Sequence, residues 1–477
     1  MLSVRLVAHL FYLLCKTDGT SQRQTTLAIR WDRFDYYARR IKKMFFDEDD
    51  LCETTVTLAN QHFTCRQLKE KPSSPLYLPS LQNLEVHSAS QEGMQFVLHH
   101  LLSPSVIQLN WTIHCPFSKP HVFNTVDHLS TTCLNVRDVT LGWLRANEYL
   151  PKGAEGWTQA LGDFAVSLPH LQSLRLTRGA LSFQHLAQLS QSEIQEIAWP
   201  SPAKWAGEVD LYTTPFFPGG FQNLRCLDGV FNETRLLMRL LKEPSLSKGL
   251  EKLVLSVKGS THYEEQEIKE YLAWVAGHHT TLKIFQTTLH SDQPSFYRYQ
   301  HLRTLGRCKQ LTELKFTYDG TMLLVDSELQ NIVVGLSNLE KIVLMPYRFD
   351  IHTSPPSLTL KSFETLQLCC PKIREIDMYV DAEVRDGVML QELVDPVAFR
   401  ANPLANLSSV GFGLSPIQDA GSVMIAKFLR SLTSQPSLNM ITIWSSIAPN
   451  YFEYKRRKVM WEKVARLIAD RNLPWIE

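Results

Sequence analysis

The sequence predicts an α/β fold in which short parallel strands stack side by side into one concave sheet, with helices on the convex side. Two observations predict this fold. First, thirteen triplets recur in which an apolar-type position is followed three residues later by a second and two residues after that by a third. Second, segments with a helical period separate the triplets. Between Leu81 and Leu438 the intervals average about 30 residues, a period typical of solenoids.

The triplets predict the strands. The last two members of each triplet lie two residues apart, so on a strand they share one face and point into the core. Gly229 and Thr287 stand where an aliphatic third member is expected, so their repeats fit the pattern least well. The triplets are Leu81/Leu84/Val86, Val106/Leu109/Trp111, Val136/Val139/Leu141, Leu171/Leu174/Leu176, Ile194/Ile197/Trp199, Leu224/Leu227/Gly229, Leu250/Leu253/Leu255, Leu282/Phe285/Thr287, Leu311/Leu314/Phe316, Leu339/Ile342/Leu344, Ile373/Ile376/Met378, Leu407/Val410/Phe412 and Leu438/Ile441/Ile443.

Apolar residues at helical spacing predict helices between the strands. One such unit leaves its apolar strand face uncovered, so neighbouring units must stack to bury it. The segments are Glu264–His278 with Ile268, Leu272 and Val275, Ser327–Leu336 with Leu329, Ile332 and Leu336, and Gly421–Leu432 with Met424, Phe428 and Leu432.

The two ends of the chain predict caps. Trp31, Phe34, Ala38, Ile41 and Phe45 recur at spacings of three and four, which predicts an amphipathic helix. The expected organisation is a helical N-terminal cap over residues 1–75, an irregular solenoid over 76–445 that forms one long domain, and a C-terminal capping helix within 446–477. A helical pattern over residues 451–468 marks that last cap.

Composition narrows the partners and the compartment. Lys and Arg total 49 against 48 for Asp and Glu, so neither a nucleic-acid nor a membrane partner is expected. Nine cysteines show no close spacing apart from the adjacent Cys369 and Cys370, so no disulfide framework is expected. A reducing compartment, cytoplasmic or nuclear, follows from this cysteine usage.

The sequence lacks the motifs of common enzymes. It contains no Gly-x-Ser-x-Gly elbow, no phosphate-binding Gly-x-x-x-x-Gly-Lys loop, no Gly-x-Gly-x-x-Gly, no His-Glu-x-x-His and no Cys-x-x-Cys. The histidines of the adjacent pairs His99/His100 and His278/His279 would point in different directions on a helix or a strand. No enzyme activity, catalytic residue, cofactor or metal ligand is therefore predicted.

The residues that flank the second and third triplet members are expected on the concave face. A protein target would find mixed charge there together with an aromatic anchor. The alternative is that most of these side chains only keep the sheet soluble. The candidate protein-binding residues are Glu85, His87, Arg175, Thr177, Lys315, Lys341, Glu375, Asp377 and Tyr379, and Asp228, Lys252 and Glu313 share their placement.

Several phrases resemble a known repeat family. Leu168-Pro-His-Leu-Gln-Ser-Leu-Arg-Leu and Leu336-Ser-Asn-Leu-Glu-Lys-Ile-Val-Leu resemble irregular leucine-rich repeats, and the openings at Cys308 and Cys370 are similar to the cysteine-containing class of F-box proteins. Trp31-Asp-Arg-Phe-Asp-Tyr-Tyr resembles the segment that introduces the repeats in fungal F-box-type proteins. The resemblance implies a horseshoe-shaped leucine-rich-repeat solenoid.

The resemblance also implies a role. The chain would be the substrate-recognition part of a ubiquitin ligase receptor, with a Skp-type adaptor as a second partner. An F-box is not recognisable before Trp31, so residues 1–75 would hold at most its remnant, with the last F-box helix at residues 10–15.

A secreted or cell-surface leucine-rich-repeat recognition protein is the alternative. Met1–Cys15 has the apolar character of a signal peptide, and Asn110-Trp-Thr, Asn232-Glu-Thr and Asn406-Leu-Ser match the glycosylation sequon. His9 interrupts the apolar run, however, and no small-residue cleavage site precedes Lys16. The intracellular interpretation is therefore preferred.

Overall fold

The chain divides into two compact units, Met1–Leu224 and Arg225–Glu477, where the sequence predicted one long domain; each unit is described on its own. No helix in the described part of the chain has the length and apolar character that a membrane crossing requires. The computed structural model describes residues 2–3, 36, 38–47, 78–88, 97–113, 128–143, 162–177, 181–200, 219–231, 234–242, 246, 249–259, 265–291, 295–346, 356–383, 404, 406–413, 415–432, 439–440 and 451–470.

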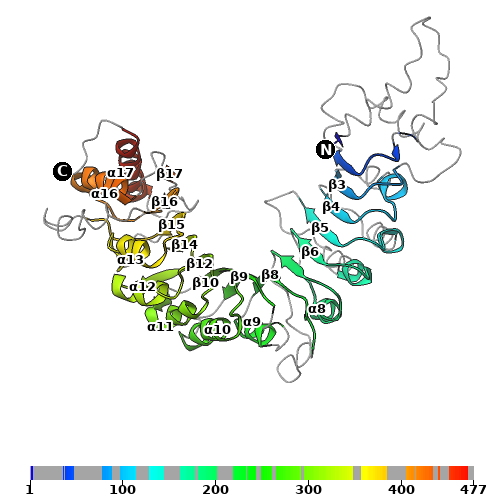
Figure 1. Cartoon of the computed structure of the whole chain (residues 1–477), viewed down its shortest axis with the longest axis horizontal. Helices are drawn as coiled ribbons and strands as arrows, with labels where there is room; N and C mark the ends of the chain where they lie inside the picture. Colours follow the sequence, from blue (N-terminus) through cyan, green and yellow to red (C-terminus); the bar gives the residue numbers. More distant parts are fainter. Residues whose placement is uncertain are drawn as a thin grey trace, which may run out of the picture. The chain divides into compact units, whose positions relative to one another are not determined.

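The strands of the first unit pair in parallel in the order of the sequence. Helical segments lie along one side of them (Figure 1). The elements are β1 (Leu2–Ser3), β2 (Lys43–Asp47), β3 (Asn83–Ser88), the π-helix η1 (Val97–Leu101), β4 (Gln108–Ile113), β5 (Asp138–Trp143), β6 (Ser173–Leu176), α8 (Phe183–Ser190) and β7 (Glu196–Trp199), with short helices at 128–132 and 162–167.

The second unit continues the same plan, with strand order β8-β9-β10-β12-β14-β15-β16-β17 and helices on one side (Figure 1). A separate two-stranded parallel sheet joins β11 to β13. The elements are β8 (Cys226–Phe231), α9 (Thr234–Leu241), β9 (Lys252–Gly259), α10 (Glu265–His278), β10 (Ile284–Ser291), β11 (Ser295–Arg298), α11 (Tyr299–Leu302), η3 (Arg303–Arg307), β12 (Glu313–Tyr318), β13 (Gly320–Leu323), α12 (Asp326–Val333), β14 (Lys341–Pro346), α13 (Ser362–Cys369), β15 (Glu375–Met378), β16 (Ser409–Gly411), η4 (Asp419–Gly421), α16 (Ser422–Leu432), β17 (Asn439–Met440) and α17 (Tyr451–Ala469).

The first twelve triplets form the core, as predicted. Their members are buried, and neighbouring strands pair them in register, as Leu84 with Leu109 and Ile342 with Ile376. The two imperfect triplets keep this register. The buried hydroxyl of Thr287 accepts a hydrogen bond from Tyr271 of α10 at 3.5 Å, which supplies the partner that a buried polar group requires. The fold is therefore an α/β leucine-rich-repeat solenoid with a parallel sheet.

Backbone hydrogen bonds join each repeat to the next. The carbonyl of the residue directly after the first triplet member accepts hydrogen bonds from two backbone N–H groups of the following repeat. The Arg137 carbonyl, for example, accepts from Gln172 N at 2.8 Å and from Ser173 N at 2.9 Å. Side-chain amides add to this stack, since Asn135 donates to the Pro104 carbonyl at 2.8 Å and Asn338 to the Lys309 carbonyl at 3.0 Å. These bonds satisfy turn carbonyls that the triplet pattern alone left unassigned.

Two sequence-based expectations are wrong. The helix predicted through Phe45 ends earlier, because Lys43–Asp47 is strand β2, paired with β3. Ile41 and Met44 are buried three residues apart, as in a further repeat, so strand pairing begins before residue 76. In the last repeat, Met440 rather than Ile441 aligns with Val410. The two errors have different causes. Three-residue spacing fits a helix and a triplet alike, and short apolar runs permit a shift by one residue.

The expected helices are present. Glu265–His278 buries Ile268, Leu272 and Val275, and the helices predicted near 327–336 and 421–432 are α12 and α16. Helix α17 covers the segment expected at the C-terminal end. Residues 10–15 and 31–34, on which the F-box resemblance partly rests, lie outside the described residues.

Candidate protein-binding face

The strand face opposite the core rows carries the candidate binding residues, and it is called the open face below. Residues on this face alternate with buried triplet members, and most of them are exposed or half-exposed. In the first unit one row runs Lys43, Asn83, Gln108, Asp138, Ser173 and Glu196, and the next runs Phe45, Glu85, Asn110, Thr140, Arg175 and Ala198.

Glu85 and His87 lie two residues apart on β3, as predicted, and face the same way. The Nε2 atom of His87 is 3.6 Å from Oε1 of Glu85. The imidazole also meets the ring of Phe45 on β2 edge to face, with 5.0 Å between centroids. An aromatic ring, an imidazole and a carboxylate on two adjacent strands form a compact contact point that a partner could use.

Arg175 and Thr177 are exposed on and just after β6, also as predicted. The Thr177 backbone donates to the Leu141 carbonyl at 2.8 Å, which extends the pairing with β5. Gly142 lies beside the Thr177 side chain, and a Cβ at that position would overlap it. The glycine therefore permits close approach of the two strands at this point.

Two carboxylates of the first unit lie on one row of this face. Burial raises the pKa of Asp138, repulsion from Glu196 raises it further, and Arg137 opposes both effects. Ser173 lies between them and donates to Glu196 at 3.5 Å. The row thus carries negative charge that this unit only partly compensates.

In the second unit an ionic ladder crosses three strands. Lys341 of β14 lies 2.7 Å from Glu375 of β15 and 4.0 Å from Glu313 of β12. Gln286 of β10 donates to Glu313 at 2.9 Å and extends the ladder by one strand. The hydrogen bond to Glu375 raises the pKa of Lys341, although partial burial opposes this. Lys341 and Glu375 therefore face solvent with their charges paired.

Part of this face is closed to solvent. Val343 and Met345 each expose only 5%, and Asp377 exposes 8%, although all three alternate with the core residues of β14 and β15. Lys315, in the same row as Val343 and Asp377, stays half-exposed on β12. The expectation that Asp377 faces solvent is therefore wrong. Burial raises the pKa of this carboxyl; attraction to Lys341 opposes the rise, and repulsion from Glu375 adds to it.

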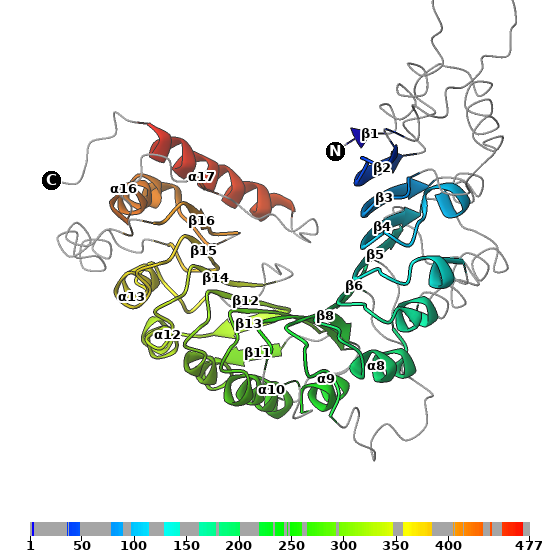
Figure 2. The ribbon, with the colours of Figure 1, turned by 45° about the vertical axis from the view of Figure 1, so that its right-hand side comes forward.

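Tyr379 follows β15 and contacts helix α17 of the same unit. The Arg457 guanidinium donates a hydrogen bond to the Tyr379 side chain; burial raises the pKa of this phenol and Arg457 opposes the rise. Figure 2 shows α17 running past β15 and β16. In the C-terminal half of α17, Lys463 Nζ lies 2.6 Å from Oδ1 of Asp419. The predicted aromatic anchor is thus already engaged within the chain.

Sequence reasoning missed several open-face residues. Asn83 and Gln108 are hydrogen-bonded to each other across β3 and β4, and Gln286 and Phe45 also lie on this face. The same strand alternation that found Glu85 could have found them. Neutral amides attract less attention than charges, although they donate and accept hydrogen bonds equally well.

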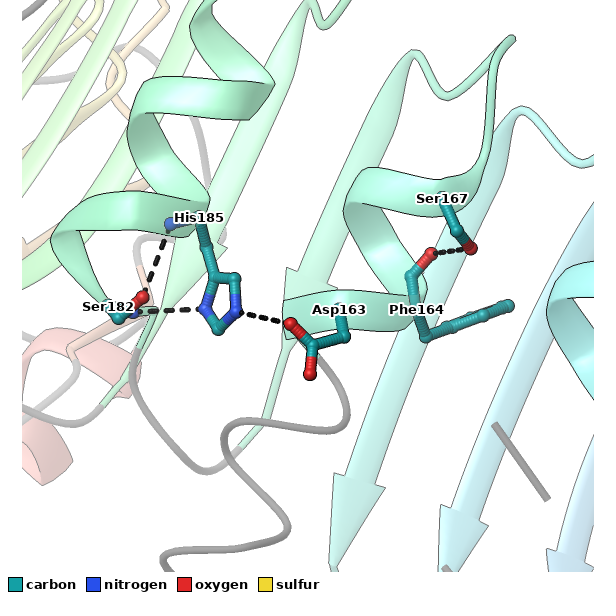
Figure 3. A network of polar contacts seen from close by, with 5 residues as sticks. All are labelled: Asp163, Phe164, Ser167, Ser182 and His185. Carbon is teal, nitrogen blue, oxygen red and sulfur yellow. Dashed lines mark hydrogen bonds and ion pairs between the residues drawn. The ribbon is translucent and has the colours of Figure 1, made fainter. Parts of the chain in front are cut away.

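A serine, a histidine and an aspartate converge in the first unit, but their hydrogen bonds serve structure (Figure 3). Ser182 Oγ accepts from the backbone of His185 at 3.2 Å, and the Ser182 backbone donates to His185 Nδ1 at 3.3 Å. Nε2 therefore carries the proton and donates to Asp163 at 3.1 Å. A catalytic serine would donate its hydroxyl to the ring. This network instead begins α8 and joins it to the preceding helix.

Clusters of metal ligands and thiols are two further kinds of group that could indicate a reactive centre. No group of three or more metal-ligating side chains occurs among them. Burial raises the pKa of Cys133 and Cys370 to about 12 and that of Cys308 to about 11, so these thiols are protonated near neutral pH. The site therefore offers hydrogen bonds and charge for binding, without an activated nucleophile.

Comparison with known proteins finds likeness of structure only. No protein-family model matches the chain, and no curated protein matches its sequence. The yeast Rad7–Elc1 complex is similar at 13% identity and a TM-score of 0.38, covering 76% of this chain and 75% of that one. An internalin, InlF, from Listeria monocytogenes is similar at 14% identity and a TM-score of 0.34, covering 82% of this chain and 96% of that one. The leucine-rich repeat-containing protein LegL7 from Legionella pneumophila is similar at 12% identity and a TM-score of 0.30, covering 82% of this chain and 97% of that one.

Proposed function

We propose that this chain is a non-enzymatic interaction module that binds a protein target on the open face of its repeats. The observation that carries the proposal is the set of exposed and half-exposed side chains along that face, among them Glu85, Arg175 and Lys315. Mixed charge beside aromatic rings is the chemistry of protein interfaces. The described residues offer binding groups without an activated nucleophile, which also favours binding over catalysis.

A finer proposal is that the chain acts as the substrate-recognition part of an F-box-type ubiquitin ligase receptor. Its support is the sequence resemblance, in which Cys308 and Cys370 open repeats as in cysteine-containing leucine-rich repeats. Both cysteines are buried at equivalent turns. The proposal includes a Skp-type adaptor as second partner and an intracellular location.

The location proposal has its own support. Cys133, Cys308, Cys369 and Cys370 are free thiols in the described part of the chain, as a reducing compartment favours. The side-chain amide of Asn406, one of the sequon asparagines, donates to the Pro371 carbonyl at 3.4 Å. An attached glycan would replace one of the hydrogens of that amide. These observations favour the intracellular receptor over the secreted alternative.

Site-specific photo-crosslinking tests the binding face. A photoreactive residue placed at Arg175 or Lys315 on the open face is expected to capture the same target protein. The matched controls are Gln330 and Leu368, which are exposed on helices α12 and α13. Capture from the helix positions but not from the open face would contradict the proposed surface.

Direct binding tests the receptor role. The full chain is mixed with a purified Skp-type adaptor, and complex formation is measured by size-exclusion chromatography with light scattering. A stable complex supports the receptor. Absence of a complex removes the ligase role and leaves the interaction module intact, because the two proposals rest on different residues.

A further inference from the structure

A hollow of about 340 Å³ lies on the first unit where strands β4, β5 and β6 begin, and it is called the rim pocket below. Its volume is near the lower end of the range for small-ligand sites, about 300–1,000 Å³. It is separate from the open face. The lining residues are Pro104, Ser105, Ile107, Asn135, Arg137 and His170.

The rim pocket arises from the repeat itself. Its lining comes from one turn in three consecutive repeats, next to the buried residues Val106, Val136 and Leu171. Two polar side chains are drawn inward, since Ser105 donates to the Leu81 carbonyl and Asn135 to the Pro104 carbonyl, both at 2.8 Å. Short side chains held against the backbone leave space between the larger ones.

The backbone in this hollow is already committed. The Ile107 carbonyl accepts from Arg137 N at 2.8 Å and from Asp138 N at 3.1 Å. The groups left to meet a ligand are therefore the side chains of Arg137, His170 and Ile107. Arg137 and His170 are exposed, and Ile107 exposes 37% of its surface.

The charge pattern at this position differs between the two units. In the second unit, charged residues directly after the first triplet member pair with an opposite charge at the same position of an adjacent repeat. Lys283 lies 2.7 Å from Glu251, and Arg374 lies 3.5 Å from Glu340. The equivalent described positions of the first unit are Lys42, Gln82, Ile107, Arg137, Gln172 and Gln195, which include no carboxylate.

Arg137 consequently lacks the partner that its counterparts have. Ile107 and Gln172 occupy the neighbouring positions where an acid would pair with it. Its electrostatic neighbour is Asp138, a half-buried residue in the adjoining row of the open face. Within the described residues, neither Arg137 nor His170 donates to a carboxylate.

We propose that the rim pocket binds an anionic group, either a carboxylate or a phosphate, with Arg137 as the principal partner and His170 as a second donor. A guanidinium forms two parallel hydrogen bonds with either anion, which adds direction to charge. Ile107, which lines the pocket, gives the short body of such a ligand an apolar contact. The anion is either a free small molecule or the acidic or phosphorylated side chain of a partner protein.

Ligand-observed NMR on the full chain tests this proposal at constant ionic strength, with inorganic phosphate and acetate as probes. Saturable binding of at least one probe is expected. Arg137→Gln is expected to weaken it about tenfold or more, because one charge-assisted pair is lost. Arg374→Gln, at the equivalent position of the second unit, is the matched control and should bind as wild type does. Both arginines are exposed, so circular dichroism is expected to show both variants folded.

A second variant sharpens the test. Ile107→Glu places a carboxylate where Glu251 stands relative to Lys283, so the chain would fill its own pocket and probe binding should be lost. Terminally blocked phosphoserine and aspartate then distinguish the two sources of the anion. Tighter binding of these amino acids than of phosphate and acetate identifies a partner protein's side chain, and equal binding identifies a free anion. Lack of saturation by both bare anions, or saturation that Arg137→Gln leaves unchanged, would overturn the proposal.

Discussion

The indole ring of Trp461 stacks on the phenyl ring of Phe412, with 4.2 Å between the centroids and 8° between the planes. Phe412 is the third member of the twelfth triplet, and Trp461 comes from α17. The indole Nε1 also donates to the Ser415 carbonyl at 3.0 Å. Because the last repeats of a solenoid would otherwise expose their apolar row, α17 acts as a cap over the core at β16.

Trp461→Ala is expected to destabilise the second unit. The substitution removes a fully buried ring and leaves a cavity beside Phe412, which costs about 3–5 kcal/mol. Urea unfolding followed by circular dichroism measures the loss. Val459→Ala on the exposed side of the same helix is the control, with an expected change within about 0.5 kcal/mol. Equal unfolding midpoints for Trp461→Ala and wild type would contradict the capping role.

Gly162→Ala is expected to destabilise the first unit. The added Cβ would overlap the imidazole of His185, which is 1% exposed, so the ring must move and its bond to Asp163 must break. Overpacking of this kind costs about 1–3 kcal/mol. Gly277→Ala is the matched control, because Gly277 lies in α10 and a Cβ added there meets no atom within 4 Å. That control should gain up to about 1 kcal/mol of unfolding free energy. A higher unfolding free energy for Gly162→Ala than for wild type would contradict the packing of His185 against this glycine.

Much of the fold followed from local pattern. Leu84 and Val86 predicted a buried strand face because residues two apart on a strand point the same way. Leu272 marked a helix because residues three or four apart on a helix share a face. Strand β2 was missed because Ile41 and Met44 fit both periods. In that case pairing with β3 decides the structure, and no short window contains it.

The candidate face was predictable only in part. The exposure of Arg175 followed from alternation along one strand. The contact between Tyr379 and Arg457 did not, since it joins residues far apart in the chain through the packing of α17. That Arg137 has no acid at the equivalent position of either adjacent repeat likewise emerged only when strand register showed which residues are its neighbours.

Lys341→Met is expected to lower the unfolding free energy by less than about 1 kcal/mol at pH 7, because the pair with Glu375 is partly exposed. The folded-state pKa of Lys341 is raised above 10.5, so the stabilisation is present below that pH and is lost as pH rises through the folded value. A double-mutant cycle with Glu375→Gln measures the coupling in urea at pH 7 and again above pH 10.5. Coupling that grows with pH would contradict the assignment.

His279 makes the solenoid sensitive to acid. Its side chain is fully buried at the turn after α10, and neither ring nitrogen has a hydrogen-bond partner in the described part of the chain. Burial lowers the pKa of His279 from 6.5 to about 4, with a smaller contribution from His278. The unfolded chain therefore binds the proton more readily, so stability is full above pH 6.5 and falls by about 3 kcal/mol as pH drops to about 4.

His279→Leu is expected to remove this acid sensitivity. Leu336, Cys308 and Cys370 occupy the equivalent turn in neighbouring repeats, three residues before the first triplet member, so an apolar side chain fits the position. Urea midpoints measured between pH 4 and 6.5 should change less with pH than in wild type. His278→Gln, at an exposed position, removes only the smaller contribution to the lowered pKa of His279, so it should keep most of the wild-type slope. Because an unpartnered imidazole gains nothing from burial in a dry core, the leucine variant should be at least as stable as wild type at pH 7. Identical pH slopes for wild type and His279→Leu would show that the proton is taken up elsewhere.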